Sequence, residues 1–299
     1  MTWDFERIAG PFQGPANGCV WDGEAVIVSL MEDMRLLRFD PRTGQATELR
    51  RYTNRVNGLG FGPNGELYGA QEGGRRLVQF LTDGRLAAVD ALLDGQYHNH
   101  PSDLCVDVKG RIWFADPHSP VLAFGPQIFP ALDHASVLRL EKNERNAWTT
   151  RRVTYDTVAP RSVLLSPDEK TLYVAEGEPR AGTTRELRAY PIESDGTVGA
   201  YTVLQTFGAD HLGPHRGIEG MCLDTDGNIV TCGGWKKSGP GPVISVLSPS
   251  GVVIESHPLP GDQPNRCCFG GEALDTLFVT TAGGELWAAK IGRTGYKRF

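Results

Sequence analysis

Polar and charged residues recur at one position of a repeated pattern, and this position is where the chain could do chemistry. In each copy the residue begins a short alternating strand, which runs through a tight turn into a second strand. The six residues, 40 to 59 positions apart, are Asn17, Asn57, Ser102, Arg161, Glu219 and Asn265. A near-constant period of this size is typical of a repeat architecture. If the repeats form a ring, the six side chains line one end of a central channel.

Arg161 and Glu219 supply the channel with one fixed cation and one carboxylate. A guanidinium is permanently charged, so Arg161 could donate hydrogen bonds to a developing oxyanion. Glu219 or Asp103 could act as the general base. The alternative is that the Arg161 side chain only fills a channel that has no function.

Two histidines precede Asp103 in the third copy. On an extended segment His98 and His100 would project to the same side. We predict that His100 is catalytic together with Arg161, Glu219 and Asp103. The alternative is that both histidines lie in the core or on the surface.

The other polar channel residues are predicted to bind substrate, and these are Asn17, Asn57, Ser102, His98 and Asn265. Segment 117–134 is long, apolar and rich in proline. Such a segment in a compact domain is more often a lid or pocket wall than a loop over an outer blade. We therefore expect Phe124, Phe129 and His134 to contribute to the wall of the pocket.

The elements that position these residues are short strands joined by turns. Each copy contains four alternating strands, and Asn-Gly and Asp-Gly pairs supply the positive φ that tight hairpins require. Six such copies with almost no helical period predict an all-β, six-bladed β-propeller that spans residues 1–299 as a single domain. Residues 3–9 are expected to pair with residues 285–291 and so close the ring.

Composition narrows the function classes. The net charge is −6, the charges are interspersed, and there is no basic stripe, which disfavours nucleic-acid binding. The chain has no apolar run long enough to cross a membrane and no apolar signal segment. We expect a cytoplasmic protein with a small-molecule partner, of undetermined oligomeric state.

Six cysteines occur without metal-ligand spacing. We expect them to be reduced, buried and structural. The alternative, a catalytic thiol, has Cys19 as its candidate.

The chain resembles the family of senescence marker protein-30, gluconolactonases and luciferin-regenerating enzyme. The resemblance covers essentially the whole length. Its motifs include Val-Asn-Gly-Leu-Gly-Phe (56–61), Glu-Gly-Gly-Arg-Arg (72–76), His-Asn-His-Pro-Ser-Asp (98–103), Trp-Phe-Ala-Asp-Pro (113–117), Leu-Asp-His-Ala-Ser-Val (132–137), Arg-Ala-Tyr-Pro (188–191) and Gly-Ile-Glu-Gly-Met (217–221). The resemblance implies a six-bladed propeller and, in many members, a calcium- or zinc-dependent lactonase or related ester hydrolase.

The resemblance fails at the positions that hold the metal ion in the family. Asn17 stands where the family usually has Glu, Ser102 and Arg161 stand where it has Asn, and Glu219 replaces Asp. A hard divalent cation requires about six oxygen ligands, and a guanidinium offers none. We therefore predict no cofactor. The alternative is one zinc or calcium ion near Glu219, with Asn17 and Asp103 as further ligands.

Three functions remain open at this stage. The first is a lactone or ester hydrolase, acting on an oxygenated and probably anionic small molecule. The second is a metal-independent isomerase, lyase or hydratase that uses acid–base residues in the same pocket. The third is a propeller that binds a small molecule without catalysis.

Overall fold

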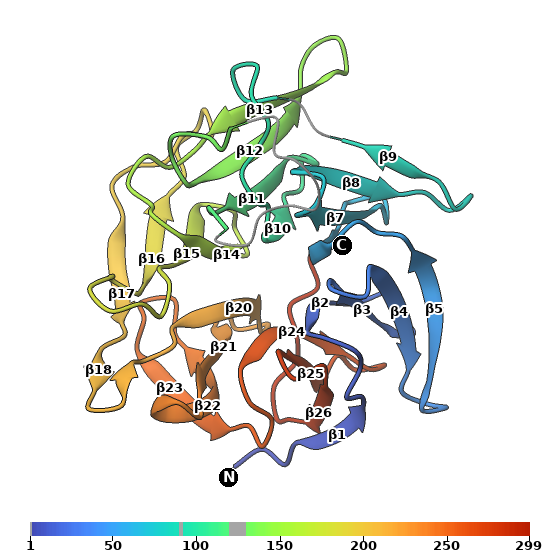
Figure 1. Ribbon diagram of the computed structural model, residues 1–299, viewed down its shortest axis with the longest axis vertical. Coiled ribbons are helices and arrows are strands. Elements are labelled where there is room, and N and C mark those ends of the chain that lie inside the picture. The colour runs from blue at the N-terminus through green and yellow to red at the C-terminus, as the bar shows by residue number, and fades with distance from the viewer. Residues whose placement is uncertain (1, 90–91, 120–129) are drawn as a thin grey trace.

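The computed structural model describes residues 2–89, 92–119 and 130–299, and within them the regular structure is entirely β. Six four-stranded antiparallel sheets are arranged as blades around a central channel, as Figure 1 shows. The predicted six-bladed β-propeller is confirmed. In these described ranges no helix is long and apolar enough to cross a membrane.

The first three blades follow the chain in order, each running from an inner to an outer strand. Blade 1 comprises β2 (Ala16–Trp21), β3 (Val26–Leu30), β4 (Arg35–Asp40) and β5 (Gln45–Arg51). Blade 2 comprises β6 (Val56–Phe61), β7 (Leu67–Gln71), β8 (Arg76–Phe80) and β9 (Leu86–Ala88). Blade 3 comprises β10 (Asp103–Val106), β11 (Ile112–Asp116), β12 (Ser136–Lys142) and β13 (Trp148–Arg152).

Blades 4 and 5 repeat this order, and blade 6 takes its outer strand from the N-terminal region. Blade 4 comprises β14 (Pro160–Leu165), β15 (Thr171–Glu176), β16 (Glu186–Pro191) and β17 (Thr202–Thr206). A small hairpin of β18 (Ala209–Asp210) and β19 (Gly213–Pro214) precedes blade 5. Blade 5 comprises β20 (Ile218–Leu223), β21 (Ile229–Trp235), β22 (Ser238–Leu247) and β23 (Val253–Pro258). Blade 6 comprises β24 (Pro264–Gly270), β25 (Thr276–Thr281), β26 (Leu286–Lys290) and β1 (Glu6–Ala9).

The ring closes as the sequence predicts. β1 pairs antiparallel with β26, and Glu6 lies opposite Ala288. The N-terminal strand therefore completes a blade whose other three strands come from the C-terminal part of the chain. This pairing covers the outer edge of β26, which would otherwise present unpaired backbone groups.

Aspartates set the inner hairpins. The Asp22 carboxylate accepts hydrogen bonds from the backbone N–H groups of Glu24 and Ala25. The Asp107 carboxylate likewise accepts from the N–H groups of Lys109 and Arg111. A side chain that caps its own turn in this way fixes the two-strand register.

The hydrophobic core is divided among the blade interfaces. Each of six buried clusters lies between two neighbouring blades. One example packs Phe278 and Leu286 of blade 6 against Val26 and Val28 of blade 1. Because every blade is packed on both faces, the inner strands are held at fixed positions around the channel.

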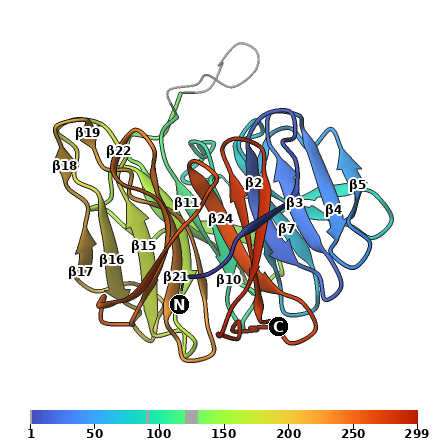
Figure 2. The same cartoon turned by 90° about the horizontal axis from the view of Figure 1, so that it is seen from below.

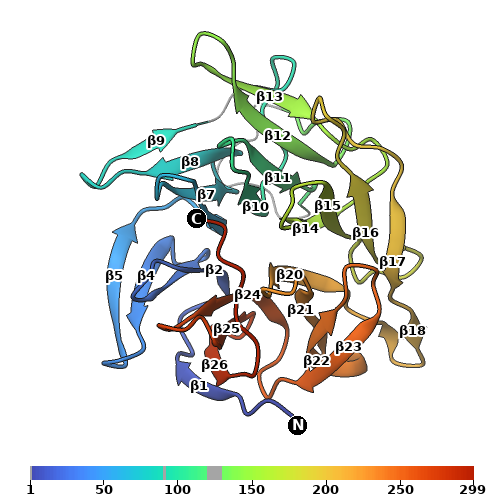
Figure 3. The same ribbon diagram turned by 180° about the vertical axis from the view of Figure 1, so that it is seen from behind.

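The C-terminal segment crosses the end of the channel that is lower in Figure 2, and the view from behind in Figure 3 shows it passing over the centre. Tyr296 N donates to Leu223 O of β20 at 2.9 Å. Arg298 Nη2 donates to Leu165 O of β14 at 2.8 Å. The segment thus reaches from blade 6 to blades 5 and 4 and covers this lower end.

Candidate functional site

A cavity of about 610 Å³ occupies the upper part of the central channel. All six recurring residues predicted to line one channel end contribute to its wall: Asn17, Asn57, Ser102, Arg161, Glu219 and Asn265. Five of them are the second residue of an inner strand, and Ser102 directly precedes β10. The repeat alignment therefore located the cavity, although it does not by itself assign a role to any of these residues.

Small residues next to the lining positions allow the inner strands to approach closely. A Cβ at Gly58 would lie 2.7 Å from the Asp103 Cα, and a Cβ at Gly220 would lie 2.3 Å from the Asn265 carbonyl oxygen. Neither neighbour is a flexible side chain, so a larger residue would push two blades apart. The Asn-Gly and Glu-Gly pairs in the sequence thus define the width of the channel.

Arginines surround Glu219. Arg161 donates from Nε and Nη2 to the Glu219 Oε2 at 3.3 and 3.1 Å. The Arg216 Nε lies 3.6 Å from Oε1, and Arg266 Nη1 donates to the Glu219 backbone oxygen. Burial raises the pKa of Glu219, but Arg161, Arg216 and Arg266 outweigh this and lower it to about 2. Glu219 is therefore a permanent anion and a poor proton acceptor at neutral pH.

Arg266 divides the channel in two. It extends from blade 6 across to blade 3, where Nε lies 3.3 Å from the Asp103 Oδ1. Its Nη2 also donates to the backbone oxygens of Ser102 and Arg161, both at 3.2 Å. Arg266 borders the upper cavity and also a lower chamber of about 210 Å³. Arg266 and Asp103 thus form a floor between the two spaces.

This floor corrects the prediction that Asp103 is a catalytic base in the substrate pocket. The Asp103 side chain borders only the lower chamber, and Ser162 Oγ donates to its Oδ2 at 2.5 Å. Burial raises its pKa, while Arg266 and Ser162 oppose that shift. Cys19, the alternative nucleophile, also lies below the floor. Neither residue borders the upper cavity.

His100 lines the upper cavity as predicted, next to a carboxylate that the sequence did not single out. Its Nδ1 lies 3.8 Å from Oε1 of Glu72. Burial, Arg75, His118 and Arg55 lower the pKa of His100 to about 4, so the imidazole is neutral at pH 7. Burial also raises the pKa of Glu72, against the effect of Arg55. Desolvated acid–base groups of this kind are typical of functional sites.

The expected partnership of His98 with His100 is wrong, because segment 97–102 is not an extended strand. The His98 ring packs against the Phe114 ring with 5.1 Å between centroids, in the core between blades 2 and 3. His134 lies outside the cavity wall, where Nδ1 is 2.9 Å from the Ser136 Oγ.

The predicted pocket wall from segment 117–134 is only partly described. Phe124 and Phe129 lie outside the described residues. Pro117, His118 and Ser119, at the start of the segment, line the cavity. The contribution of Phe124 and Phe129 to the pocket wall therefore stays a prediction.

Asparagines complete the wall on the side of blades 1, 2 and 6. Asn17 Nδ2 donates to the Asn57 Oδ1 at 3.0 Å, and the buried Asn17 Oδ1 receives no hydrogen bond from the described residues. Asn265 accepts from Arg216 Nη2 at 2.9 Å and donates to the Ala16 carbonyl at 3.0 Å. Both polar atoms of Asn265 are thus engaged, with Arg216 and with Ala16, whereas the Asn17 Oδ1 retains its acceptor capacity for a ligand.

The charges around Glu219 bear on whether a divalent cation could bind at the position that the family resemblance indicates. Arg161 occupies the open side of Glu219, and Asn17 and Ser102 add only neutral oxygens. A metal ion at this point would lie against a guanidinium instead of a ring of anionic oxygens. Among the described residues, no three His, Cys, Asp or Glu side chains are grouped so that they could hold a metal.

Sequence reasoning did not identify Glu72, Arg216 and Arg266 as site residues. Arg266 directly follows the lining residue Asn265, and the register of β24 is irregular between Pro264 and Cys267, so simple strand alternation does not hold there. Glu72 directly follows β7, the second strand of blade 2, and Arg216 lies two residues before the inner strand β20, so neither occupies the recurring position. The only signal available for Glu72 was its place in the Glu-Gly-Gly-Arg-Arg motif.

Comparisons with known proteins agree with this architecture. The chain is 27% identical to a gluconolactonase of Zymomonas mobilis over 76% of its length, and the match spans 60% of that protein. It is 26% identical to a 6-deoxy-6-sulfogluconolactonase of Pseudomonas putida, covering 83% of this chain and 76% of the relative.

A solved gluconolactonase from Xanthomonas campestris superposes with a TM-score of 0.79 at 24% identity, covering 96% of this chain and 89% of the other. This likeness concerns the fold. The profile of the SMP-30/gluconolactonase/LRE-like region matches residues 15–283. The chain therefore belongs to the SMP-30/gluconolactonase/LRE-like family.

Proposed function

We propose that this protein is a lactonase-like hydrolase that replaces the divalent ion of its relatives with arginine and uses His100 as its acid–base group. The observation that carries the proposal is that one cavity contains both a cluster of positive charges and a separate acid–base pair. Arg161 and Arg216 supply positive charge beside Glu219, while His100 and Glu72 supply a neutral base beside a desolvated carboxyl group. Three relatives are named as lactonases, namely the gluconolactonase, the 6-deoxy-6-sulfogluconolactonase and a pentonolactonase of Haloferax volcanii, and these names support the reaction class.

Arg161 is suited to stabilise negative charge on a substrate oxygen. It uses Nε and Nη2 on Glu219, which leaves Nη1 without an acceptor among the described residues. About a third of its side chain, 31%, is exposed. A donor that is already oriented toward the position where charge develops is the main requirement of oxyanion stabilisation. Glu219 holds the guanidinium in place.

His100 is better suited than Glu219 to move the proton. In the proposed reaction water attacks the lactone carbonyl carbon and its proton passes to His100, while Arg161 stabilises the tetrahedral oxyanion. The ring C–O bond then breaks, and the leaving alkoxide takes the proton from His100, which gives the hydroxy acid. Glu72 lies within reach of the imidazolium that forms between these steps, and an adjacent carboxylate stabilises that charge.

The cavity favours an oxygenated and anionic substrate. Among the residues that the structure describes, its wall carries five arginines, Arg55, Arg161, Arg180, Arg216 and Arg266, against four glutamates, Glu32, Glu72, Glu178 and Glu219. The buried Asn17 Oδ1 offers an acceptor to a substrate hydroxyl group. A hydroxylated lactone with an acidic substituent satisfies both features.

A second function is consistent with the same groups. A neutral imidazole near a guanidinium could remove a proton next to a carboxylate and return it elsewhere, as in a metal-independent isomerase, lyase or hydratase. The pairing of His100 with Glu72 supports this alternative to the same degree, because it does not depend on an attacking water. The products distinguish the two functions.

The test is a panel of neutral and acidic sugar lactones, followed by continuous titration of released acid in chelator-treated protein. We expect hydrolysis that EDTA leaves unchanged, and at least a 100-fold loss in kcat/KM for Arg161→Ala, the usual effect of losing one oxyanion donor. The control is Arg151→Ala, an exposed blade 3 arginine paired with Glu141, which should retain full activity.

Three outcomes would contradict the proposal. Loss of hydrolysis in EDTA, with recovery on adding calcium or zinc, would show that a metal ion is required. Conversion of a hydroxy acid without acid release would favour the isomerase, lyase or hydratase. Saturable ligand binding without turnover of any lactone would favour a non-catalytic binding protein.

A further inference from the structure

The lower chamber of the channel is lined by sulfur. Five of the six cysteines border it, namely Cys19, Cys105, Cys222, Cys267 and Cys268. Tyr296 and Arg298 of the C-terminal segment also line it, and Arg266 separates it from the cavity above. The chamber takes no part in the proposed hydrolysis, so the sulfur atoms require their own explanation.

The cysteines form two pairs on either side of β24. The sulfurs of Cys19 in β2 and Cys268 in β24 lie 3.2 Å apart. The sulfurs of Cys222 in β20 and Cys267 in β24 lie 3.4 Å apart. All six cysteines are free thiols in this structure. Each pair joins blade 6 to one of its two neighbours.

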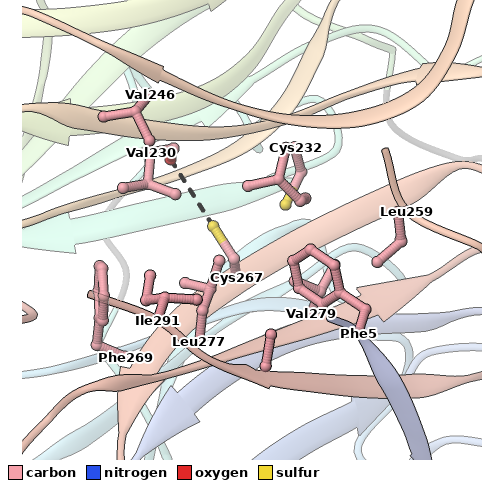
Figure 4. Packing of buried hydrophobic residues seen from close by; sticks show 12 residues of the cluster. Phe5, Val230, Cys232, Val246, Leu259, Cys267, Phe269, Leu277, Val279 and Ile291 are labelled. Carbon is pink, nitrogen blue, oxygen red and sulfur yellow. Dashed lines mark hydrogen bonds between the residues drawn. The ribbon is translucent and has the colours of Figure 1, made fainter. Parts of the chain in front are cut away.

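Strand alternation explains this arrangement. Cys267 and Cys268 are consecutive, so their side chains leave β24 on opposite faces. Cys267 packs in the cluster between blades 5 and 6, where Figure 4 shows it beside Val230 and Cys232. Cys268 packs against the cluster between blades 6 and 1, which contains Cys19. Both sulfur contacts are therefore fixed by the packing of the blades.

We propose that Cys19–Cys268 and Cys222–Cys267 are modification sites at which a hydroperoxide forms two disulfides that link blade 6 to blades 1 and 5. Hydrogen peroxide is the appropriate oxidant because a chamber of about 210 Å³ admits it and excludes bulky disulfides. The proposal is independent of the hydrolase function, since the pairs lie below the Arg266 floor.

In the Cys222–Cys267 pair the reaction begins at Cys267, which is the more acidic thiol. Hydrogen bonds from Cys222 and Cys232 lower the pKa of Cys267 below the usual value of a thiol. The Cys267 thiolate attacks one peroxide oxygen, the O–O bond breaks, and the hydroxide released takes a proton to become water. The Cys222 sulfur then displaces the hydroxyl group of the sulfenic acid as a second water, forming the S–S bond. Two thiols and one peroxide thus give one disulfide and two waters.

The expected consequence is a more stable ring. The two links would close chain segments between residues 19 and 268 and between 222 and 267. A cross-link restricts the unfolded chain more strongly when the closed loop is long. Oxidation should therefore raise the thermal midpoint, and reduction with dithiothreitol should return it to its starting value.

The experiment treats the reduced, folded protein with hydrogen peroxide, alkylates the remaining thiols under denaturing conditions and maps peptides without reduction. We expect alkylatable thiols to fall from six to two, namely Cys105 and Cys232, with both cross-linked peptides present. Cys268→Ser should lose only the first link, and Cys222→Ser only the second. The control Cys105→Ser, which removes a thiol of the same chamber, should keep both links.

Several results would overturn the proposal. These are six alkylatable thiols after peroxide treatment, sulfinic acid in place of the cross-links, or a link from Cys267 to Cys232. Mapping of the unsubstituted protein decides between these results, so the test does not depend on the folding of any variant. Formation of the links in urea-unfolded protein at the same rate would also refute it, because the packed blades would then contribute nothing.

Discussion

Replacing Glu219 by Gln should destabilise the fold, because the three arginines around this carboxylate would lose the negative charge that they share. The pKa of Glu219 is lowered from 4.5 to about 2. At about 1.4 kcal/mol per pKa unit, this shift corresponds to roughly 3 kcal/mol of net stabilisation by the ionised carboxylate. We expect Glu219→Gln to lower the free energy of unfolding at neutral pH by about this amount.

The stabilisation by Glu219 should depend on pH in a defined direction. A carboxyl group with a depressed pKa in the folded state stabilises the fold above its unfolded pKa, 4.5, and loses that contribution as the pH falls toward 2. The difference between the native protein and Glu219→Gln should therefore be constant from neutral pH to about pH 5 and shrink below it. Urea unfolding followed by tryptophan fluorescence at a series of pH values measures it.

Glu72→Gln is the matched control in the same cavity. Burial raises the pKa of Glu72 above 4.5, so ionisation of this residue costs stability once the pH rises through the folded pKa. Removing the charge at neutral pH should leave the free energy of unfolding unchanged or slightly increased. Equal losses in both variants, or a Glu219→Gln loss that persists unchanged at about pH 3, would refute the electrostatic reasoning.

Further predictions concern the proposed chemistry and its pH range. His100→Asn should lower kcat about 100-fold or more, the usual effect of losing a general base, while substrate affinity measured by calorimetry changes little. The pKa of His100 is lowered from 6.5 to about 4, so the unfolded chain binds a proton at this residue more readily than the folded protein does. The free energy of unfolding should therefore decrease as the pH falls from 6.5 to about 4, and His100→Asn should make this decrease smaller. Deleting 121–130 should impair turnover more than the thermal midpoint, and unchanged turnover would contradict a role in the pocket wall. The triple variant Asn17→Glu, Ser102→Asn and Arg161→Asn should gain calcium affinity detectable by calorimetry and lose the native activity; absence of calcium binding would show that the altered residues are not what excludes the ion.

The repeat in the sequence determined the fold and the position of the cavity. Residues near the start of each inner strand, such as Asn57 and Glu219, recur together with turn residues at similar spacings. Six such copies of four strands predict a ring of four-stranded blades. Alternation along each strand then directs equivalent side chains to one axis. The sequence also predicted the pairing of the first strand, Glu6–Ala9, with the last, because a propeller ring closes when a terminal strand completes the blade formed by the other end of the chain.

The tertiary structure decided which polar residues work together. Asp103 and Arg266 are separated by more than half the chain, yet blades 3 and 6 lie on opposite sides of the channel, so the two side chains meet and form its floor. That contact removes Asp103 from the substrate cavity, which local sequence could not reveal. His98 was mispredicted for a related reason, because an irregular segment does not follow strand alternation. Contacts across a closed ring depend on its diameter and on the reach of long side chains, and neither is encoded in the local pattern.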